Sequence, residues 1–311
     1  MKKRNILVTG GTGFIGSRLV KRLLRSKANV VVISREVEKN PEIRKLVERG
    51  EIQLVQCNLI NQKELNKYKD IFKNVEFVIH LAAFVPNKSN EDDLSKSMEN
   101  IRGALNLVCA FNSIERFCFG STVEVYGKPI YCPLDENHPT NPLTYYGASK
   151  LACEKYLQVH SWKNNFPLTI LRFASVYGEG ETIDRAIPNF IKSVCVGKAP
   201  VIYGDGSDLR DYVYVDDVVD GILLSLKHGK NNVYNIAGGN GLSIKKIAEQ
   251  IIRLSGKKLA PEFKKTKKEK VDYIFDISRA KKDLHYSPKI RFEDGLKKEI
   301  KWFKESLEKR E

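Results

Sequence analysis

The chain has 311 residues, 42% of them hydrophobic, which is enough to bury one large α/β core or two fused lobes. Its 53 basic and 38 acidic residues give a formal net charge of +15, which suits phosphate-bearing ligands. No stretch is long and apolar enough to span a membrane, and no aromatic residues interleave with the lysines of residues 264–270. We therefore expect a folded protein without a membrane or a nucleic acid as partner.

The cysteines and histidines do not form a metal-binding pattern. The six cysteines are scattered, with no CxxC pair and no nearby Cys/His cluster. Several lie inside apolar runs, where a thiol packs as a small core residue. The sequence thus predicts no metal site and a reducing, cytoplasmic location.

In chain order, segments rich in β-branched residues alternate with segments of helical period. Strands are predicted at residues 6–8, 30–33, 53–56, 77–81, 116–120 and 168–173, and helices at 17–24, 100–111 and 146–160. This alternation is typical of an α/β fold of the Rossmann type, a doubly wound parallel sheet. We expect residues 1–173 to form the dinucleotide-binding domain.

After residue 173 the elements become shorter and glycine turns more frequent. Residues 174–311 are therefore predicted to form mainly a smaller C-terminal α/β lobe that binds the substrate. Strands near residues 212–236, at 212–215 and 233–236, are expected to rejoin the main sheet, so the two lobes need not be separate in sequence.

A glycine-rich turn directly follows the first predicted strand and opens the first helix. Its residues are Gly10, Gly11, Thr12, Gly13, Phe14, Ile15 and Gly16. Glycines at this position allow a tight turn and close approach of the backbone to a pyrophosphate, which faces the positive end of the helix dipole. The order strand, loop and helix favours a dinucleotide site over an ordinary glycine-rich turn.

The end of the second predicted strand bears on which dinucleotide binds. An acidic residue there binds a free ribose 2′-hydroxyl, whereas an arginine accommodates a 2′-phosphate. This chain has Ser34 and Arg35 at that point and no acid. NADP(H) is therefore favoured over NAD(H), unless Arg35 is simply a solvated surface residue.

Tyr146 and Lys150 lie four residues apart in a predicted helix, so they project from the same face. Tyr145 would point well round the helix from Lys150. A cation beside a phenol stabilises the phenolate and makes the tyrosine a usable acid or base near neutral pH. Alone, the pair also fits a helix with a buried ring and an exposed lysine.

Together with the glycine turn, the pair makes the chain resemble the extended short-chain dehydrogenase/reductase family, in its NAD-dependent epimerase/dehydratase group. The resemblance runs nearly end to end. Beyond the two motifs, it includes residues 80–83, 100–103, 121–127, 171–173, 176–178, 203–206, 210–212, 215–218 and 276–288. It implies the Rossmann-type fold and a nicotinamide cofactor.

The resemblance also implies roles for individual residues. Tyr146 would exchange a proton with a sugar hydroxyl, Lys150 would bind the nicotinamide ribose, and Thr122 would hydrogen-bond the same sugar oxygen. Further cofactor contacts are implied for Asn58, Leu59, Leu81, Ala82, Ala83 and Asn100. Substrate contacts are implied for Thr122, Ser175 and Arg210, with the arginine clamping a diphosphate.

Two positions depart from the family pattern. Asn58 stands where an aspartate is usual, although its amide oxygen can still accept a hydrogen bond. Ser175 replaces the more usual asparagine, which weakens any claim about the nucleotide.

The reaction that the resemblance favours is epimerisation at C4 of a nucleotide-diphosphate sugar through a transient 4-keto-sugar, as in UDP-glucose 4-epimerases. One alternative is a 4,6-dehydratase in which Glu124 removes the C5 proton, although Val123 lacks the acid found in one dehydratase class. Another is an NADPH-dependent 4-keto-sugar reductase, which Ser34 and Arg35 favour. A sensor without catalysis is a further alternative, against which Thr122, Tyr146 and Lys150 argue.

The resemblance finally implies a homodimer. The helices at 100–111 and 146–160 of two copies would pack as a four-helix bundle. Leu105, Leu151 and Leu157 are candidates for its apolar outer face.

Overall fold

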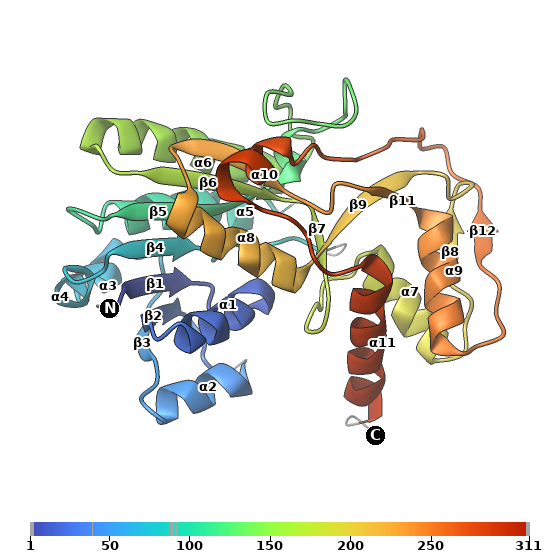
Figure 1. The fold of residues 1–311 in the computed structure, drawn as a ribbon, viewed down its shortest axis with the longest axis horizontal. Coiled ribbons are helices and arrows are strands. Elements are labelled where there is room, and N and C mark those ends of the chain that lie inside the picture. The colour runs from blue at the N-terminus through green and yellow to red at the C-terminus, as the bar shows by residue number, and fades with distance from the viewer. Residues whose placement is uncertain (1–2, 39, 88–89, 91–92, 309–311) are drawn as a thin grey trace.

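The computed structural model describes residues 3–38, 40–87, 90 and 93–308. Its centre is a seven-stranded sheet in the order β10-β6-β5-β4-β1-β2-β3, and all neighbouring strands are parallel (Figure 1). The strands are β1 (Asn5–Thr9), β2 (Asn29–Ser34), β3 (Gln53–Gln56), β4 (Phe77–His80), β5 (Arg116–Thr122), β6 (Leu168–Phe173) and β10 (Asn232–Ile236). The predicted α/β fold of the Rossmann type is confirmed.

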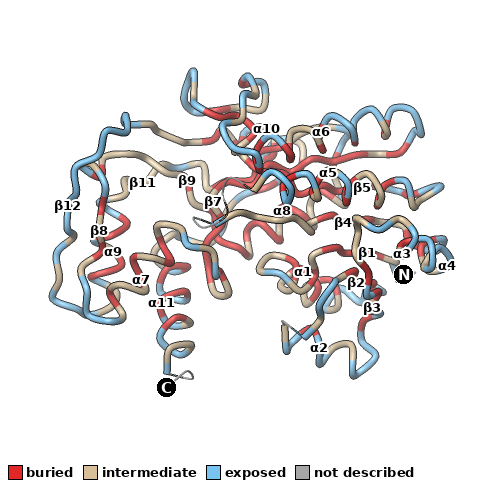
Figure 2. The backbone as a smooth tube through the Cα atoms, turned by 180° about the vertical axis from the view of Figure 1, so that it is seen from behind, coloured by how far each residue is buried: buried red, intermediate tan, exposed pale blue. Residues whose placement is uncertain are grey.

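Helices cover both faces of this sheet and bury a separate core on each. On one face α1 (Phe14–Arg25), α2 (Pro41–Glu48) and α8 (Val215–His228) pack on the even-numbered residues of β1, such as Val8. On the other face α3 (Gln62–Asn66), α4 (Lys69–Phe72), α5 (Leu94–Val108) and α6 (Tyr145–Asn164) cover residues such as Leu7. Burial on both sides explains why the strands read as continuous apolar runs; the buried backbone gathers along them in Figure 2.

The second half of the chain builds a smaller lobe beside the carboxyl ends of the main strands. It holds a three-stranded sheet of β7 (Ser175–Tyr177), β9 (Leu209–Tyr214) and β11 (Gly241–Ser243) and a parallel pair of β8 (Val201–Tyr203) and β12 (Glu262–Lys264). Three helices pack together in it: α7 (Ala186–Cys195), α9 (Ile244–Ser255) and α11 (Phe292–Glu308) (Figure 1). The short α10 (Ser278–Leu284) lies near α8 instead.

One part of the predicted topology is wrong. The predicted strand at 233–236 does pair with β6 as the last strand of the main sheet. The predicted strand at 212–215 does not join that sheet, because β9 pairs with β7 and β11, and Val215 already begins α8. The chain leaves the sheet after Phe173, and β7 offers β9 a new edge. The division at residue 173 stays a prediction.

Side-chain caps make two helices longer than their apolar period predicts. The Asp93 carboxylate accepts a hydrogen bond from Lys96 N and begins α5 at Leu94, and the Thr144 hydroxyl accepts one from Gly147 N and begins α6 at Tyr145. None of the helices within the described residues is both long and apolar enough to cross a bilayer.

The outer face of the α5 and α6 pair differs from the predicted one. Leu157 is fully buried in the core below α6, so it cannot lie on an outer face. Leu105 and Leu151 are partly buried. The exposed large apolar residues of the two helices are Leu94, Met98, Tyr145, Tyr156, Val159 and Trp162.

Candidate active site

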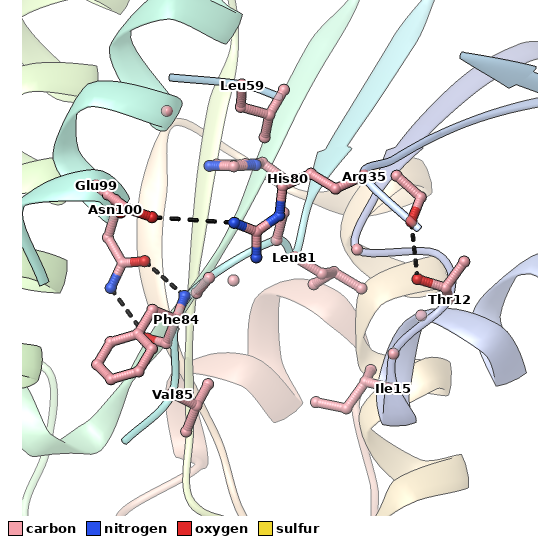
Figure 3. A pocket seen from close by; sticks show the side chains of 18 of the residues that line it. Thr12, Ile15, Arg35, Leu59, His80, Leu81, Phe84, Val85, Glu99 and Asn100 are labelled. Atoms are coloured by element: carbon pink, nitrogen blue, oxygen red, sulfur yellow. Dashed lines mark hydrogen bonds and ion pairs between the residues drawn. The ribbon is translucent and has the colours of Figure 1, made fainter. Parts of the chain in front are cut away.

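A cavity of about 640 Å³ opens where β1, β2 and β4 end, the edge at which doubly wound sheets bind their ligands. Every residue predicted to contact the cofactor lines it (Figure 3). They are Gly10, Thr12, Gly13, Phe14, Ile15, Gly16, Ser34, Arg35, Asn58, Leu59, Leu81, Ala82, Ala83, Asn100, Tyr146 and Lys150. Ten residues from elsewhere in the chain and one turn thus meet around a single space of dinucleotide size.

The glycine turn is shaped by contacts that leave no room for side chains. Gly10 has a φ of +70°, and a Cβ there would lie 2.7 Å from Ala82 N. A Cβ on Gly16 would lie 2.1 Å from Gly10 O. The turn is therefore held tightly against β4 and α1, with free backbone N–H groups at the start of the helix, so it fits a pyrophosphate.

Ser34, the last residue of β2, and Arg35 line one part of the cavity. Ser34 Oγ and Thr12 Oγ1 are 3.1 Å apart, within hydrogen-bond distance, which ties β2 to the glycine turn. Arg35 is 62% exposed in its side chain, and its Nη1 is 4.0 Å from Glu99 Oε2 (Figure 3). The guanidinium is thus at the cavity and held by one weak, solvated ion pair.

Asn100 and Asn58, both predicted to contact the cofactor, form hydrogen bonds with the backbone. Asn100 accepts a hydrogen bond from Phe84 N (2.7 Å) and donates to Phe84 O (3.1 Å), so it fixes the irregular segment that follows β4 and lines the cavity (Figure 3). Asn58 Oδ1 accepts a hydrogen bond from Ile60 N at 3.3 Å.

His80 is buried, and its Nδ1 is 2.7 Å from Thr9 Oγ1. Burial lowers the pKa of His80 to about 3, so it packs as a neutral ring.

Tyr146 and Lys150 lie together on the buried face of α6 at the inner end of the cavity. Tyr146 is 7% exposed, whereas Tyr145 is 46% exposed and does not line the cavity. Lys150 is buried with its Nζ 4.1 Å from the centre of the Phe119 ring. The predicted arrangement of phenol and ammonium is present, in a wall that excludes water.

Burial sets the protonation of both groups. It lowers the pKa of Lys150 to about 8, against the charge of Cys153 and Glu154, which raise it. It also raises the pKa of Tyr146, as does Glu124, while Arg185 and a hydrogen bond with Thr122 lower it. Burial raises the pKa of Tyr146 more than nearby cations lower it, so without a ligand Tyr146 is a neutral phenol near pH 7.

Thr122 and Glu124 stand beside this pair without lining the dinucleotide cavity. Thr122 ends β5, is buried, and accepts a hydrogen bond from Glu124 N at 3.3 Å. Glu124 Oε2 accepts from Thr144 Oγ1 at 3.2 Å, and Oε1 lies 4.0 Å from Arg185 Nη2. Glu124 thus lies near Tyr146 and beside Arg185 of the second lobe, with a side chain that is 38% exposed.

Ser175 and Arg210 lie in the smaller lobe, outside the residues that line the cavity. Arg210 donates to the backbone carbonyl oxygens of Leu209 (2.9 Å) and Val271, and its guanidinium lies 5.1 Å from the centre of the Tyr273 ring. In turn, the pKa of Tyr273 is raised chiefly by burial, lowered by Arg210 and raised by Glu124. Arg210 thus lies in the smaller lobe beside Tyr273, whose other charged neighbour is Glu124.

The structure adds residues that the sequence analysis missed. Glu181, Thr182 and Ile183, from the loop between β7 and α7, line the cavity opposite the glycine turn. The signal for this loop is the pair Gly178 and Gly180, which have φ values of +137° and +96°. Glu154, one turn after Lys150, binds Arg172 in the core, and it lies outside the motifs of the sequence.

Comparisons with known proteins agree with this geometry. A sequence model described as "NAD dependent epimerase/dehydratase family" matches residues 6–237. A putative UDP-glucose 4-epimerase of Methanocaldococcus jannaschii is 34% identical over 96% of this chain and 98% of that protein. A UDP-glucuronate 4-epimerase of Thermodesulfobacterium geofontis is 31% identical over 97% of each chain.

Solved structures are similar over the whole chain. A Thermotoga maritima UDP-glucose 4-epimerase with UDP-glucose has a TM-score of 0.88 and 30% identity, over 97% of this chain and 99% of that one. A Bacillus cereus UDP-glucuronic acid 4-epimerase with UDP-glucuronic acid and NAD has a TM-score of 0.86 and 31% identity, with the same coverage.

The fold and the cavity define an enzyme that binds a nicotinamide dinucleotide. The chain belongs to the NAD dependent epimerase/dehydratase family, within the extended short-chain dehydrogenases/reductases. It is an enzyme of the epimerase kind.

Proposed function

We propose that the protein interconverts nucleotide-diphosphate sugars that differ in configuration at C4. The observation that carries the proposal is the buried pair of Tyr146 and Lys150 in the wall of a dinucleotide cavity, with Thr122 beside the phenol. Relatives and neighbours along the whole chain are named as 4-epimerases of UDP-sugars, which supports the same reaction.

The residues account for the proton steps of such a reaction. When bound, the nicotinamide supplies reversible hydride transfer and, in its oxidised form, a positive charge. Tyr146, neutral without ligand, becomes a usable base once that charge offsets the burial and Glu124 that raise its pKa. It then takes the C4 hydroxyl proton and later returns it, while Lys150 stays charged below about pH 8.

Dehydration is the second candidate, because Glu124 acts on the pKa of Tyr146 and therefore lies near the reacting atoms. Human dTDP-D-glucose 4,6-dehydratase is 28% identical over 98% of this chain. Reduction is a third, since an Escherichia coli dTDP-4-dehydro-6-deoxyglucose reductase is 30% identical over 96% of the chain. Epimerisation is favoured because it needs no acid beyond Tyr146.

The three reactions are separated by incubating the purified protein with UDP-, dTDP-, GDP- and CDP-sugars and following the products by NMR. We expect a C4 epimer without net change of the added dinucleotide. Loss of water to a 4-keto-6-deoxy sugar would support the dehydratase instead, and stoichiometric consumption of NADPH would support the reductase.

The choice between NADP(H) and NAD(H) depends on Arg35. Its exposed guanidinium at the cavity suits a 2′-phosphate, whereas several solved neighbours hold NAD. If a 2′-phosphate binds there, Arg35→Ala loses a charge-assisted contact worth about 1.5–3 kcal/mol and weakens NADPH binding about 10- to 100-fold, with NADH unchanged. Titration calorimetry measures both, with the exposed Arg49→Ala as control. Equal affinities in wild type and Arg35→Ala would remove the preference.

We also propose a homodimer through α5 and α6. Tyr156, Val159 and Trp162 recur at helical spacing on α6, and Trp162 is 78% exposed. Leu94 and Met98 add an exposed apolar pair on the adjacent α5. A surface of this kind is typical of an interface.

A charge on the exposed part of α6 should break the dimer. We expect Trp162→Glu to shift the protein to monomer at micromolar concentration, because the carboxylate would be buried without a partner. Analytical ultracentrifugation provides the mass. Ile130→Glu, in a loop outside α5 and α6 and with a similar exposure of 75%, should leave the mass unchanged. A wild-type monomer, or a Trp162→Glu dimer, would contradict this interface.

A further inference from the structure

The loop between β7 and α7 closes one side of the dinucleotide cavity. Gly178 and Gly180 turn the chain with positive φ values, and a Cβ on Gly180 would lie 3.5 Å from the ring of Phe14, in the first turn of α1. The next three residues, Glu181 to Ile183, line the cavity. The loop therefore places a carboxyl group near the end of α1 at which a pyrophosphate binds.

That carboxyl group has little access to water. Glu181 is 3% exposed. Two cations, Arg185 and Lys192, act on it, but each is shared with another carboxylate: Arg185 lies 4.0 Å from Glu124, and Lys192 Nζ lies 2.8 Å from Asp184. Burial wins over both cations and raises the pKa of Glu181 to about 7.

The far side of Glu181 is also acidic. Glu299 of α11 is 0% exposed, and neither of its carboxylate oxygens has a hydrogen-bond partner among the described side chains. Burial raises the pKa of Glu299 to about 9, as do the charges of Glu181 and Glu179. Glu299 is therefore a neutral carboxylic acid at pH 7, and it does not stabilise an ionised Glu181. Tyr212 also interacts with both carboxyl groups; burial raises its pKa to about 12, so it is neutral too.

A dinucleotide brings two negative charges to this place. An ionised Glu181 would repel them in a region of low dielectric, whereas a protonated one can donate a hydrogen bond to an acceptor of the ligand. We propose that binding of the dinucleotide is coupled to uptake of one proton by Glu181, which contacts the bound cofactor as a neutral acid. This inference rests on the assignment of the cavity to a nicotinamide dinucleotide.

The sign of the pH dependence follows. Glu181 is protonated below about pH 7 and charged above it. Binding should therefore be pH-independent on the acid side, release or take up no proton there, and weaken as the pH rises, approaching tenfold per unit. Glu299 lines no part of the cavity, so it does not contact a ligand bound there.

Calorimetric titration with NAD⁺ and NADP⁺, near pH 6 and near pH 8 and in buffers of different ionisation enthalpy, tests the proposal. Wild type should take up close to one proton near pH 8 and none near pH 6. Glu181→Gln, isosteric and neutral, should bind with the same affinity at both pH values and take up none. Glu179→Gln is the matched control: Glu179 contacts Arg18 and Tyr214 and does not line the cavity, so proton uptake should persist.

The outcomes are separable. Lys150, in the same cavity, has a pKa lowered to about 8 by burial and also titrates in this range. Proton uptake that survives in Glu181→Gln would assign it to Lys150 and overturn the inference, as would binding by wild type without uptake. If neither NAD⁺ nor NADP⁺ bound at any pH, the cofactor assignment itself would be overturned.

Discussion

Replacing Tyr146 by phenylalanine should lower kcat by about 10²- to 10⁴-fold, the usual contribution of a positioned acid or base. The substitution removes only the hydroxyl group from a ring that is 7% exposed and packed in the cavity wall. The fold and the dinucleotide affinity should therefore change little. The rate is measured by NMR on the substrate found in the sugar panel, and binding by calorimetry.

Tyr145→Phe is the matched control, because it makes the same chemical change one residue earlier. Tyr145 is 46% exposed and does not line the cavity, so kcat should stay within about twofold of wild type. Full activity in Tyr146→Phe would remove the catalytic proposal and favour a sensor that kept the fold.

Glu154→Ala should cost the largest amount of stability of any single change proposed here. The carboxylate is fully buried and accepts hydrogen bonds from Arg172 Nε (3.0 Å), Arg172 Nη2 (2.7 Å) and Ser121 Oγ (2.5 Å). Its removal leaves the Arg172 guanidinium, stacked on Tyr126, with an unpaired buried charge. Such a loss costs about 3–5 kcal/mol in the free energy of unfolding, measured by urea denaturation.

Two further variants separate the charge from the packing. Glu154→Leu with Arg172→Met replaces the pair by apolar side chains and should recover most of the lost stability. Glu38→Ala, which removes an exposed ion pair with Arg44, should change the free energy of unfolding by less than about 1 kcal/mol. A Glu154→Ala variant as stable as wild type would show that the buried pair contributes nothing.

The sequence was sufficient for the parts of the molecule that local chemistry determines. The glycine turn needs a positive φ at Gly10 and empty space at Gly16, and only glycine meets both demands. Because the parallel strands are buried on both faces, their sequences are continuous apolar runs, from which the strands could be predicted. The spacing of Tyr146 and Lys150 placed them on one helix face, because the helical period is fixed.

The rest depended on long-range packing. Whether β9 or β10 joins the main sheet is decided by which edge each strand meets, and no local pattern records that choice. The helical spacing of Leu157 was compatible with the predicted outer face, but the residue faces the core. Glu181 and Glu299 are 118 positions apart in the sequence and become neighbours only in the fold, so their protonation could not be predicted from the sequence.

The central claim is that a hydride leaves C4 of a nucleotide sugar and returns to the same carbon within one site. It is tested most directly with the sugar identified in the panel, labelled with deuterium at C4 and followed by NMR in ordinary water. We expect both epimers to keep deuterium at C4, with no exchange of the C5 hydrogen. Deuterium that moves to C6 with loss of water, or disappears from the sugar, would contradict it.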